Sequence, residues 1–291
     1  MGKELVLTVF SKVLFAFISV RIILVFLFIL FLVPEIAYAL VEDNLQGYYS
    51  YDVDISTDDK NANDGTASSG AVRTTSNKKL GAGAADFDAS SNAEISISPT
   101  NFQSATAFSF TAWLRVDGDF GGVDTSYGGI IAYINGANRR SMVNTAGAVL
   151  FQDLVDDESL SSSAPGIINQ TNANWHFYAL VLDDSTTKHY VNGVENGSVA
   201  SDLDPAGATN IELGQGQSNA YYYNGQMDEV GIWDGKALSA TEIAYLYNGG
   251  DGCNPVTTNC NGCGPGRYLV SGQCEVVGAG FYSAVATDTR T

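Results

Sequence analysis

Residues 175–199, WHFYALVLDDSTTKHYVNGVENGSV, decide the fold that this sequence predicts. The stretch opens with residues 175–182, which are almost continuously apolar and indicate a strand buried on both faces. A second short strand, residues 188–191, leads into Asn192-Gly193. Because both residues of this pair tolerate positive φ, they favour a tight hairpin turn before a partner strand at 194–199. The stretch therefore predicts a buried strand followed by an antiparallel hairpin.

Strands of the same kind are predicted on both sides of this stretch, from about residue 45 to residue 248. Residues 108–116 alternate so that one face carries Phe108, Phe110, Ala112, Leu114 and Val116. The other predicted strands cover residues 48–51, 94–98, 129–134, 148–152, 211–214 and 221–233. Gly, Asn, Asp and Ser clusters separate them, and no helices alternate with them, which excludes a parallel α/β sheet. We therefore expect an all-β, two-sheet antiparallel sandwich over residues 40–250.

One short helix is predicted at the end of this domain. Ser239 and Glu242 have the spacing of a capping box, in which each side chain bonds the free backbone N–H of the other residue. Ile243 and Leu246 follow at helical spacing, and the glycine pair at 249–250 ends the helix. We expect this C-terminal helix to pack against the edge of the sandwich.

The first 39 residues differ from the rest of the chain. Two lysines precede an unbroken apolar run at 22–33, and Ala37-Tyr38-Ala39 supplies the small residues that signal peptidase reads. We interpret residues 1–39 as a secretory signal peptide cleaved after Ala39, which predicts a secreted or cell-surface protein. The alternative is a retained membrane anchor, because residues 13–33 are long enough to span a bilayer, although Arg21 interrupts them. Only this uncleaved segment would contact a membrane.

The chain is strongly acidic, with 14 Lys+Arg against 32 Asp+Glu and a formal net charge of −18. Such a charge repels phosphate backbones and excludes nucleic acid as a partner. It fits a soluble extracellular protein, and it would also suit the uptake of calcium through carboxylates.

All four cysteines lie in a Gly- and Cys-rich tail, residues 251–291. They are Cys253, Cys260, Cys263 and Cys274. A zinc ribbon could use the central C-x-x-C pair, but secretion favours disulfides, and four cysteines allow three pairings that the sequence leaves open. We therefore expect a small disulfide-rich tail.

Four stretches within residues 45–248 form a recognisable series. The first is YYSYD at 48–52, followed by NANDG at 61–65, and the second is ADFD at 85–88. The third is WHFYA at 175–179 with YVNG at 190–193, and the fourth is GQMDEVGIW at 225–233 with ALS at 237–239. In this order they resemble the opening strand and its loop, the short FDG strand, the central strand pair and the closing strand of the laminin-G-like jelly roll of the concanavalin A-like lectin/glucanase superfamily.

The tail is similar to the cysteine-rich repeats of receptor-like surface proteins, through CGPGRY at 263–268. A second unit beginning at Gly278 lacks its leading cysteine and is incomplete at Thr291. The resemblance therefore implies that this sequence is a piece of a longer surface protein.

The jelly-roll resemblance implies a structural calcium ion between the opening loop and the closing strand. The matching positions are Asp64, Asp88 and Asp228, whose carboxylates are the ligand type that calcium prefers. The alternative is that Asp64 and Asp88 are ordinary turn residues and that Asp228 caps a strand end. A paired-calcium site like that of pentraxins is not expected, because Gly216 and Ser218 occupy its acidic positions.

Sugar binding needs aromatic faces for stacking, together with polar groups that bond hydroxyls. Tyr221, Tyr222, Tyr223 and Asn224 offer both, and so do Tyr127 and residues 135–140. In a strand, Tyr221 and Tyr223 would share one face and Tyr222 would lie on the other, so one of these faces would pack in the core. We take the segment 221–224 as the candidate ligand-binding site.

Catalytic residues are not expected. Hydrolases on the resembled fold place their acids in a Glu-x-Asp-x-Glu run, which is absent, and the nearest acidic cluster, residues 153–158, begins with Asp and precedes a Ser-rich loop. The chain has two histidines; we expect His176 to be structural and His189 to face solvent.

These observations favour a non-catalytic extracellular recognition module that binds carbohydrate, a glycan, or a surface protein. The second hypothesis is a structural or adhesion spacer within a large surface protein, for which the cysteine-rich tail is typical. A polysaccharide hydrolase ranks last, since the fold alone hosts lectins, spacers and enzymes.

Overall fold

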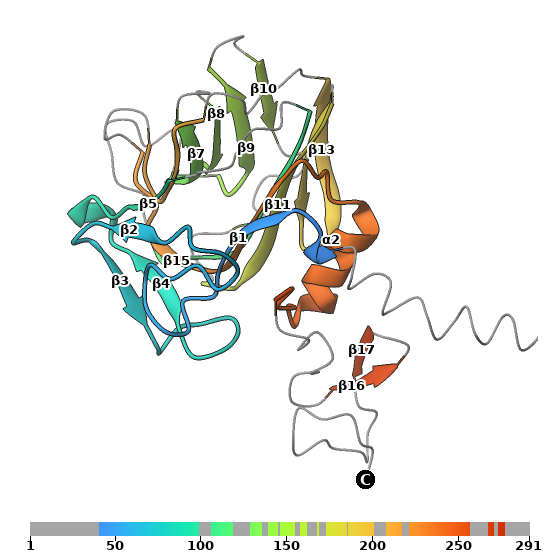
Figure 1. Ribbon diagram of the computed structural model, residues 1–291, viewed down its shortest axis with the longest axis horizontal. Helices are drawn as coiled ribbons and strands as arrows, with labels where there is room; N and C mark the ends of the chain where they lie inside the picture. Colours follow the sequence, from blue (N-terminus) through green and yellow to red (C-terminus); the bar gives the residue numbers. More distant parts are fainter. Residues whose placement is uncertain are drawn as a thin grey trace, which may run out of the picture.

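Two antiparallel sheets form the body of the protein (Figure 1). The computed structural model describes residues 41–98, 106–118, 129–135, 139–144, 146–154, 158–161, 168, 173–184, 186–200, 208–216, 221–256, 267–270 and 273–276. The predicted signal peptide, Tyr127, Cys260 and Cys263 lie outside the described residues. Within these ranges, no helix has the length and apolar character needed to cross a membrane.

The larger sheet contains eight of the described strands. Seven lie side by side in the order β13 (Val194–Ala200), β12 (Thr186–Val191), β11 (His176–Asp183), β6 (Ala107–Val116), β15 (Gly225–Asp234), β4 (Ala84–Phe87) and β3 (Ala71–Thr74). The eighth strand, β1 (Leu45–Tyr49), pairs with β15 further along than β4 does, with Tyr48 opposite Gly231.

The second sheet contains seven of the described strands. Their spatial order is β10 (Glu158–Ser161), β9 (Val149–Asp153), β8 (Arg139–Val143), β7 (Gly129–Asn135), β14 (Asn210–Leu213), β5 (Ile95–Ile97) and β2 (Gly65–Ala67). A separate hairpin in the tail pairs β16 (Arg267–Val270) with β17 (Gln273–Val276). Two 3-10 turns are also present: η1 (Ala89–Ser91) lies between β4 and β5, and η2 (Asn248–Gly250) follows the C-terminal helix. The predicted antiparallel sandwich is confirmed.

The central hairpin has the predicted form. β11 pairs with β12 on one side and with β6 on the other, and its residues from Phe177 to Leu182 are all buried. Asn192 and Gly193 make the turn between β12 and β13 with φ values of 51° and 79°. The Asn192 side-chain oxygen also accepts the Phe177 backbone N–H at 3.0 Å, so the turn is bonded to the start of β11.

The main core lies between the two sheets. On β6 it takes up Phe108, Phe110, Ala112, Leu114 and Val116, the five residues that sequence alternation places on one face. From the second sheet it takes up Ile131, Phe151 and Ile211. A hydrogen bond of 3.0 Å from the Tyr178 hydroxyl of β11 to Ser141 Oγ of β8 joins the sheets across this core.

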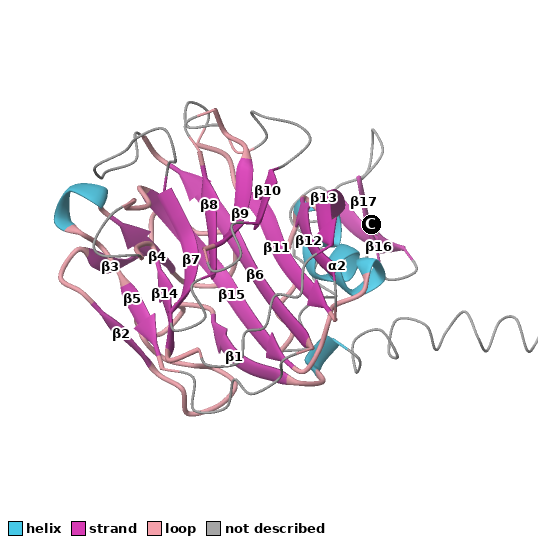
Figure 2. Cartoon of the chain, turned by 90° about the horizontal axis from the view of Figure 1, so that it is seen from above, coloured by secondary structure: helices cyan, strands magenta, loops and turns pink. Residues whose placement is uncertain are grey.

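The outer face of the larger sheet carries a second apolar cluster, covered by the helix α2 (Ala240–Tyr247). Trp113, on the face of β6 opposite to the core, stacks on Tyr247 with ring centroids 5.9 Å apart. The predicted capping box is present: Ser239 N–H donates to Glu242 Oε2 at 2.8 Å, and Glu242 N–H donates to Ser239 Oγ at 3.3 Å. Figure 2 shows α2 at the β13 end of the molecule, with β16 and β17 close by.

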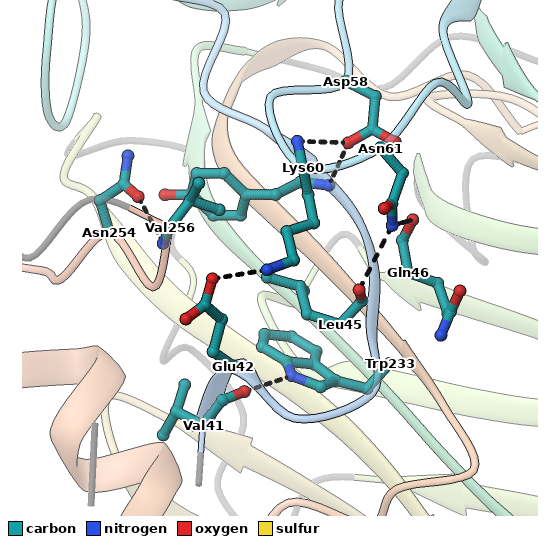
Figure 3. Close-up of polar contacts among 11 residues, drawn as sticks. Val41, Glu42, Leu45, Gln46, Asp58, Lys60, Asn61, Trp233, Asn254 and Val256 are labelled. Carbon is teal, nitrogen blue, oxygen red and sulfur yellow. Dashed lines mark hydrogen bonds and ion pairs between the residues drawn. The ribbon is translucent and has the colours of Figure 1, made fainter. Parts of the chain in front are cut away.

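The two ends of the described sandwich meet on this outer face (Figure 3). Val41 is fully buried in the second cluster, and its carbonyl accepts the Trp233 indole N–H at 2.7 Å. Glu42 forms an ion pair with Lys60 at 2.5 Å. Val256, where the tail begins, packs against the same cluster. The chain therefore enters and leaves the sandwich at one place.

The first tail cysteine belongs to this packed region. Cys253 is 3 % exposed, and it is disulfide-bonded. Its bond partner is not among the described side chains, so the pairing among Cys253, Cys260, Cys263 and Cys274 stays open.

The Asn192-Gly193 turn gives a first test. Gly193→Ala should lower the free energy of unfolding by about 1–2 kcal/mol, because a residue with a Cβ is strained at a left-handed φ. Its Cβ would also lie 2.8 Å from Tyr247 Cδ1. Urea unfolding measures the change. Val194→Ala, at a neighbouring side chain that is 67 % exposed, is the control and should change stability by less than about 0.5 kcal/mol. Equal effects of the two changes would contradict this account of the turn.

Candidate ligand-binding face

The candidate segment 221–224 crosses from one sheet to the other. Tyr221 has a φ of 65°, so this segment does not alternate as a strand would, and the expectation that Tyr221 and Tyr223 share a face is wrong. Tyr223 is fully buried in the main core, where its ring meets Phe87 edge-on at 6.1 Å. Its hydroxyl donates to the Gln226 carbonyl at 3.3 Å. Tyr223 therefore anchors the segment and does not face a ligand.

Tyr221 lies instead on the outer face of the second sheet. It packs against Tyr133 and Met142, which alternate with core residues along β7 and β8. Tyr221 is half-buried and Tyr222 is 6 % exposed. We call this region the tyrosine face; it consists of Tyr133, Tyr221 and Tyr222 together with Glu94, Arg140 and Glu212.

Strand register brings the polar members of the tyrosine face into one row. Tyr133 of β7 lies opposite Arg140 of β8 on one side and opposite Glu212 of β14 on the other. The row continues to Gln152 of β9 beyond Arg140 and to Ser96 of β5 beyond Glu212. Side chains directly opposite one another in antiparallel strands contact each other, so the row is continuous across five strands.

Arg140 joins two stretches, 135–140 and 221–224, that are separate sugar-binding candidates in the sequence. Its guanidinium carbon lies 5.0 Å from the centre of the Tyr221 ring, within the range of a cation–π contact. Its Nε donates to Gln152 Oε1 at 2.8 Å. Arg140 is only 6 % exposed, so it orients Tyr221 from below rather than projecting into solvent.

Glu212 is held by two amides. Its Oε1 accepts the side-chain N–H groups of Asn135 and Asn210, each at 3.1 Å. Asn210 also donates to Ser96 Oγ at 3.0 Å. Both donors reach the same oxygen, so Oε1 is held in place while the residue stays partly exposed.

The pKa shifts of this face reflect burial and negative charge. Burial, then the neighbouring Glu212, raises the pKa of Glu94. Burial also raises the pKa of Tyr133, with Glu212 adding to the shift and Arg140 opposing it. The pKa of Tyr222 rises through burial and then through Glu94. The face therefore has an acidic field despite the presence of Arg140.

Asn224, the last candidate residue, belongs to a different polar cluster on the outer face of the larger sheet. Its carbonyl accepts the Asp117 N–H at 3.1 Å. Gln226, two residues later, donates its amide nitrogen both to Asp86 and, at 2.7 Å, to Asp117, and its amide oxygen accepts from Arg115. Asn224 is thus bonded to this cluster through its backbone carbonyl.

Asp86 and Asp117 form one pair of neighbouring carboxylates in this cluster, both bonded to Gln226. A hydrolase keeps the space between its two carboxylates open for the scissile bond or a water molecule. Here the Gln226 amide nitrogen fills that space, and Arg115 forms an ion pair with Asp117. Of the other acidic cluster, Asp156 and Asp157 lie outside the described residues.

The three aspartates predicted to bind calcium are separate from one another. Asp64 accepts the Asp58 N–H at 3.0 Å in the opening loop. Asp88 caps η1, and the hydroxyls of Ser90 and Ser91 together with the backbone N–H of Ser90 lower its pKa. Asp228 is fully buried and accepts backbone N–H groups from Lys79 and Leu80. In the part of the chain that the structure describes, no group of three or more His, Cys, Asp or Glu residues could hold a metal ion. These residues do not fit one calcium site, and calcium binding stays a prediction.

The two histidines are structural in different ways. His176 Nδ1 lies 3.2 Å from Asn192 Nδ2 beside the hairpin turn. His189 is fully buried, so the expectation that it faces solvent is wrong. It lies on the core face of β12 opposite Leu180, and burial lowers its pKa to about 4, with the Asn196 backbone and Glu195 opposing the shift.

Comparison with family models shows the family. A laminin-G-type model, described as the concanavalin A-like lectin/glucanases superfamily, matches residues 88–244, more than half of the chain. The chain belongs to the concanavalin A-like lectin/glucanase superfamily. This membership confirms the resemblance noted in the sequence. A search of curated protein sequences gives no significant match.

Solved structures similar to this superfamily member include carbohydrate- and protein-binding domains. Domain 4 of AbnA, an extracellular arabinanase from Geobacillus stearothermophilus, in complex with arabinotriose, is 19% identical with a TM-score of 0.51. The match covers 69% of this chain and 97% of that domain.

The binding domain of Botulinum neurotoxin DC is also similar. Its complex with rat synaptotagmin II is 12% identical with a TM-score of 0.55, over 78% of this chain and 56% of that one. Its complex with SialylT is 12% identical with a TM-score of 0.52, over 72% and 52%. The chain therefore spans about half of these toxin domains. Identities this low show a shared fold alone.

Glu229 gives a pH test of the closing strand. It lies in the β-bulge of β15 with a φ of 53°, is 4 % exposed, and burial raises its pKa to about 8. The folded state holds this proton more tightly than the unfolded chain does. The contribution of the Glu229 carboxyl to folding stability is therefore full below about pH 4.5 and is lost as the pH rises toward 8. Glu229→Gln should remove the share of this dependence that Glu229 contributes, while Asp228, whose pKa burial also raises to about 8, keeps its own share. The stability gained over wild type should grow with pH, to the order of a few kcal/mol near pH 8.

Urea unfolding at pH 5, 6, 7 and 8 measures the difference. Asp43→Asn, at an exposed carboxylate before β1, is the control and should leave the pH profile unchanged. Parallel profiles for wild type and Glu229→Gln would show that Glu229 is not the group responsible.

Calcium binding has its own test. If calcium binds the folded chain, adding millimolar calcium to chelator-treated protein should raise the melting temperature by mass action, by several degrees for a site filled well above its Kd. Magnesium serves as the control cation. A melting temperature that stays the same with chelator, calcium and magnesium would rule out the structural calcium ion.

Proposed function

We propose that this chain is a non-catalytic recognition module that binds glycans through its tyrosine face. The observation that carries the proposal is the half-buried Tyr221 ring, held by Arg140 at 5.0 Å and set beside a row of amide and carboxylate side chains. A sugar offers an apolar ring face to an aromatic side chain and hydroxyls to planar polar groups. Both kinds of partner occur side by side on this face.

Further support comes from the fold and from the acid pair. Similar domains bind a sugar in one solved complex and a protein in another, which fits a binding module with either kind of partner. The filled space between Asp86 and Asp117 argues against hydrolysis at that pair. The acidic composition and residues 1–39 support a secreted or cell-surface location for such a module.

A structural or adhesion spacer is the second candidate. The observation favouring it is that Val41 and Val256 pack into one apolar cluster, so the chain enters and leaves at the same place. A module with this geometry can be inserted between neighbours of a longer chain without disturbing its core. For a pure spacer, substitutions on the tyrosine face would affect no binding event.

Tyr221 tests the proposal directly. Tyr221→Ala removes the aromatic face and should weaken binding of the best glycan from an array by about tenfold. Tyr221→Phe keeps the ring and should retain most of the affinity. Isothermal titration calorimetry measures both, and thermal melting checks that the variants are folded. Wild-type affinity in Tyr221→Ala would place glycan binding elsewhere on the protein.

A further inference from the structure

The tyrosine face has a marked imbalance between acidic and basic groups. Glu94 and Glu212 are both partly exposed, and each lies close enough to neighbouring groups to shift a pKa. Arg140, the basic member of the face, is 6 % exposed and already bonded to Gln152 and stacked on Tyr221. A ligand anion at this face would meet two carboxylates and a cation with little exposed surface.

Basic side chains elsewhere in the described part of the chain are also engaged. Each described arginine and lysine side chain except the exposed Lys78 has a partner within the protein; they are Lys60, Arg73, Lys79, Arg115, Arg139, Arg140, Lys188 and Lys236. Together with the net charge of −18, this leaves no free basic cluster in that part of the chain to attract a sulfate, phosphate or carboxylate group.

Glu212 offers what a neutral sugar needs. Its Oε1 is occupied by the amides of Asn135 and Asn210 at 3.1 Å each. These two bonds orient the carboxylate and leave Oε2 as the remaining strong acceptor. Hydroxyl groups are donors as well as acceptors, and a hydrogen bond to an ionised carboxylate is about twice as strong as one between neutral groups.

We infer that the ligand of the tyrosine face is a neutral, polyhydroxylated glycan, and that Glu212 Oε2 accepts its hydroxyl hydrogens while Tyr221 stacks on its ring. The inference rests on the proposed function, and it narrows the ligand class to neutral sugars. Glycans carrying sialic acid, uronic acid or sulfate are disfavoured by the carboxylates at 94 and 212.

The experiment screens the purified full chain on an array with two arms. One arm holds neutral arabino-, galacto-, gluco- and manno-oligosaccharides, and the other holds sialylated, uronic-acid-containing and sulfated glycans. The expected result is binding in the neutral arm, with an affinity that changes less than about twofold between 50 mM and 500 mM NaCl, because no ligand charge is screened.

Glu212→Gln then tests the residue. The amide can keep one acceptor for Asn135 and Asn210, but it loses the ionised oxygen, so affinity for the best neutral glycan should fall on the order of ten- to a hundredfold. Glu195→Gln, an exposed carboxylate on β13 of the other sheet, is the matched control and should bind as wild type. Equal melting temperatures for wild type and Glu212→Gln show that the loss is not one of folding.

The outcomes separate the inference from the function. Binding confined to anionic glycans, or stronger binding after Glu212→Gln, would overturn the neutral-ligand inference and leave glycan recognition standing. Binding to neutral glycans that Glu212→Gln does not weaken would overturn the role of Glu212. The absence of binding in both arms would overturn the proposed function itself, and the inference with it.

Discussion

The antiparallel pairing of β6 with β15 is the contact on which the rest of the structure depends. The inner side chains of both strands fill the core between the sheets, and their outer side chains, Trp113 and Trp233, build the cluster that α2 covers. A bulge at Asp228–Gly231 lets the other edge of β15 pair first with β4 and then with β1. The segment leading into β15 carries Tyr221 to the opposite sheet, anchored by Tyr223 in the core. The tyrosine face therefore takes its position from the central strand pair.

The parts of the fold that depend on neighbours in sequence could be predicted. The Asn192-Gly193 turn and the Ser239–Glu242 capping box are set by a few adjacent residues, and alternation along 108–116 reports burial directly. β8 was missed because Arg139-Arg140 looks like a polar loop. In the structure one arginine points between the sheets and the other supports Tyr221, and only tertiary contacts make both positions favourable. β2 and β3 are too short to show a period.

The candidate site was half predicted. Tyrosine and amide side chains were recognised as sugar-binding types, but alternation assigned them to the wrong faces, because nothing local signals that Tyr221 takes a positive φ. The contact between Arg140 and Tyr221 joins residues far apart in sequence, and the row from Gln152 to Ser96 exists only once five strands are in register. Glu212 had no signal beyond its strand. His189 was placed wrongly because a polar side chain on a hairpin usually faces water.

The hydrogen bond from the Trp233 indole N–H to the Val41 carbonyl has a mechanical consequence. That contact and the packing of Val256 lie on the outer side of the larger sheet, whereas Tyr221 lies on the outer side of the other sheet, with the core between them. Tension pulling on the chain at either junction is borne first by the indole and by α2. The tyrosine face lies on the other sheet, so the core separates it from a load applied at these two junctions.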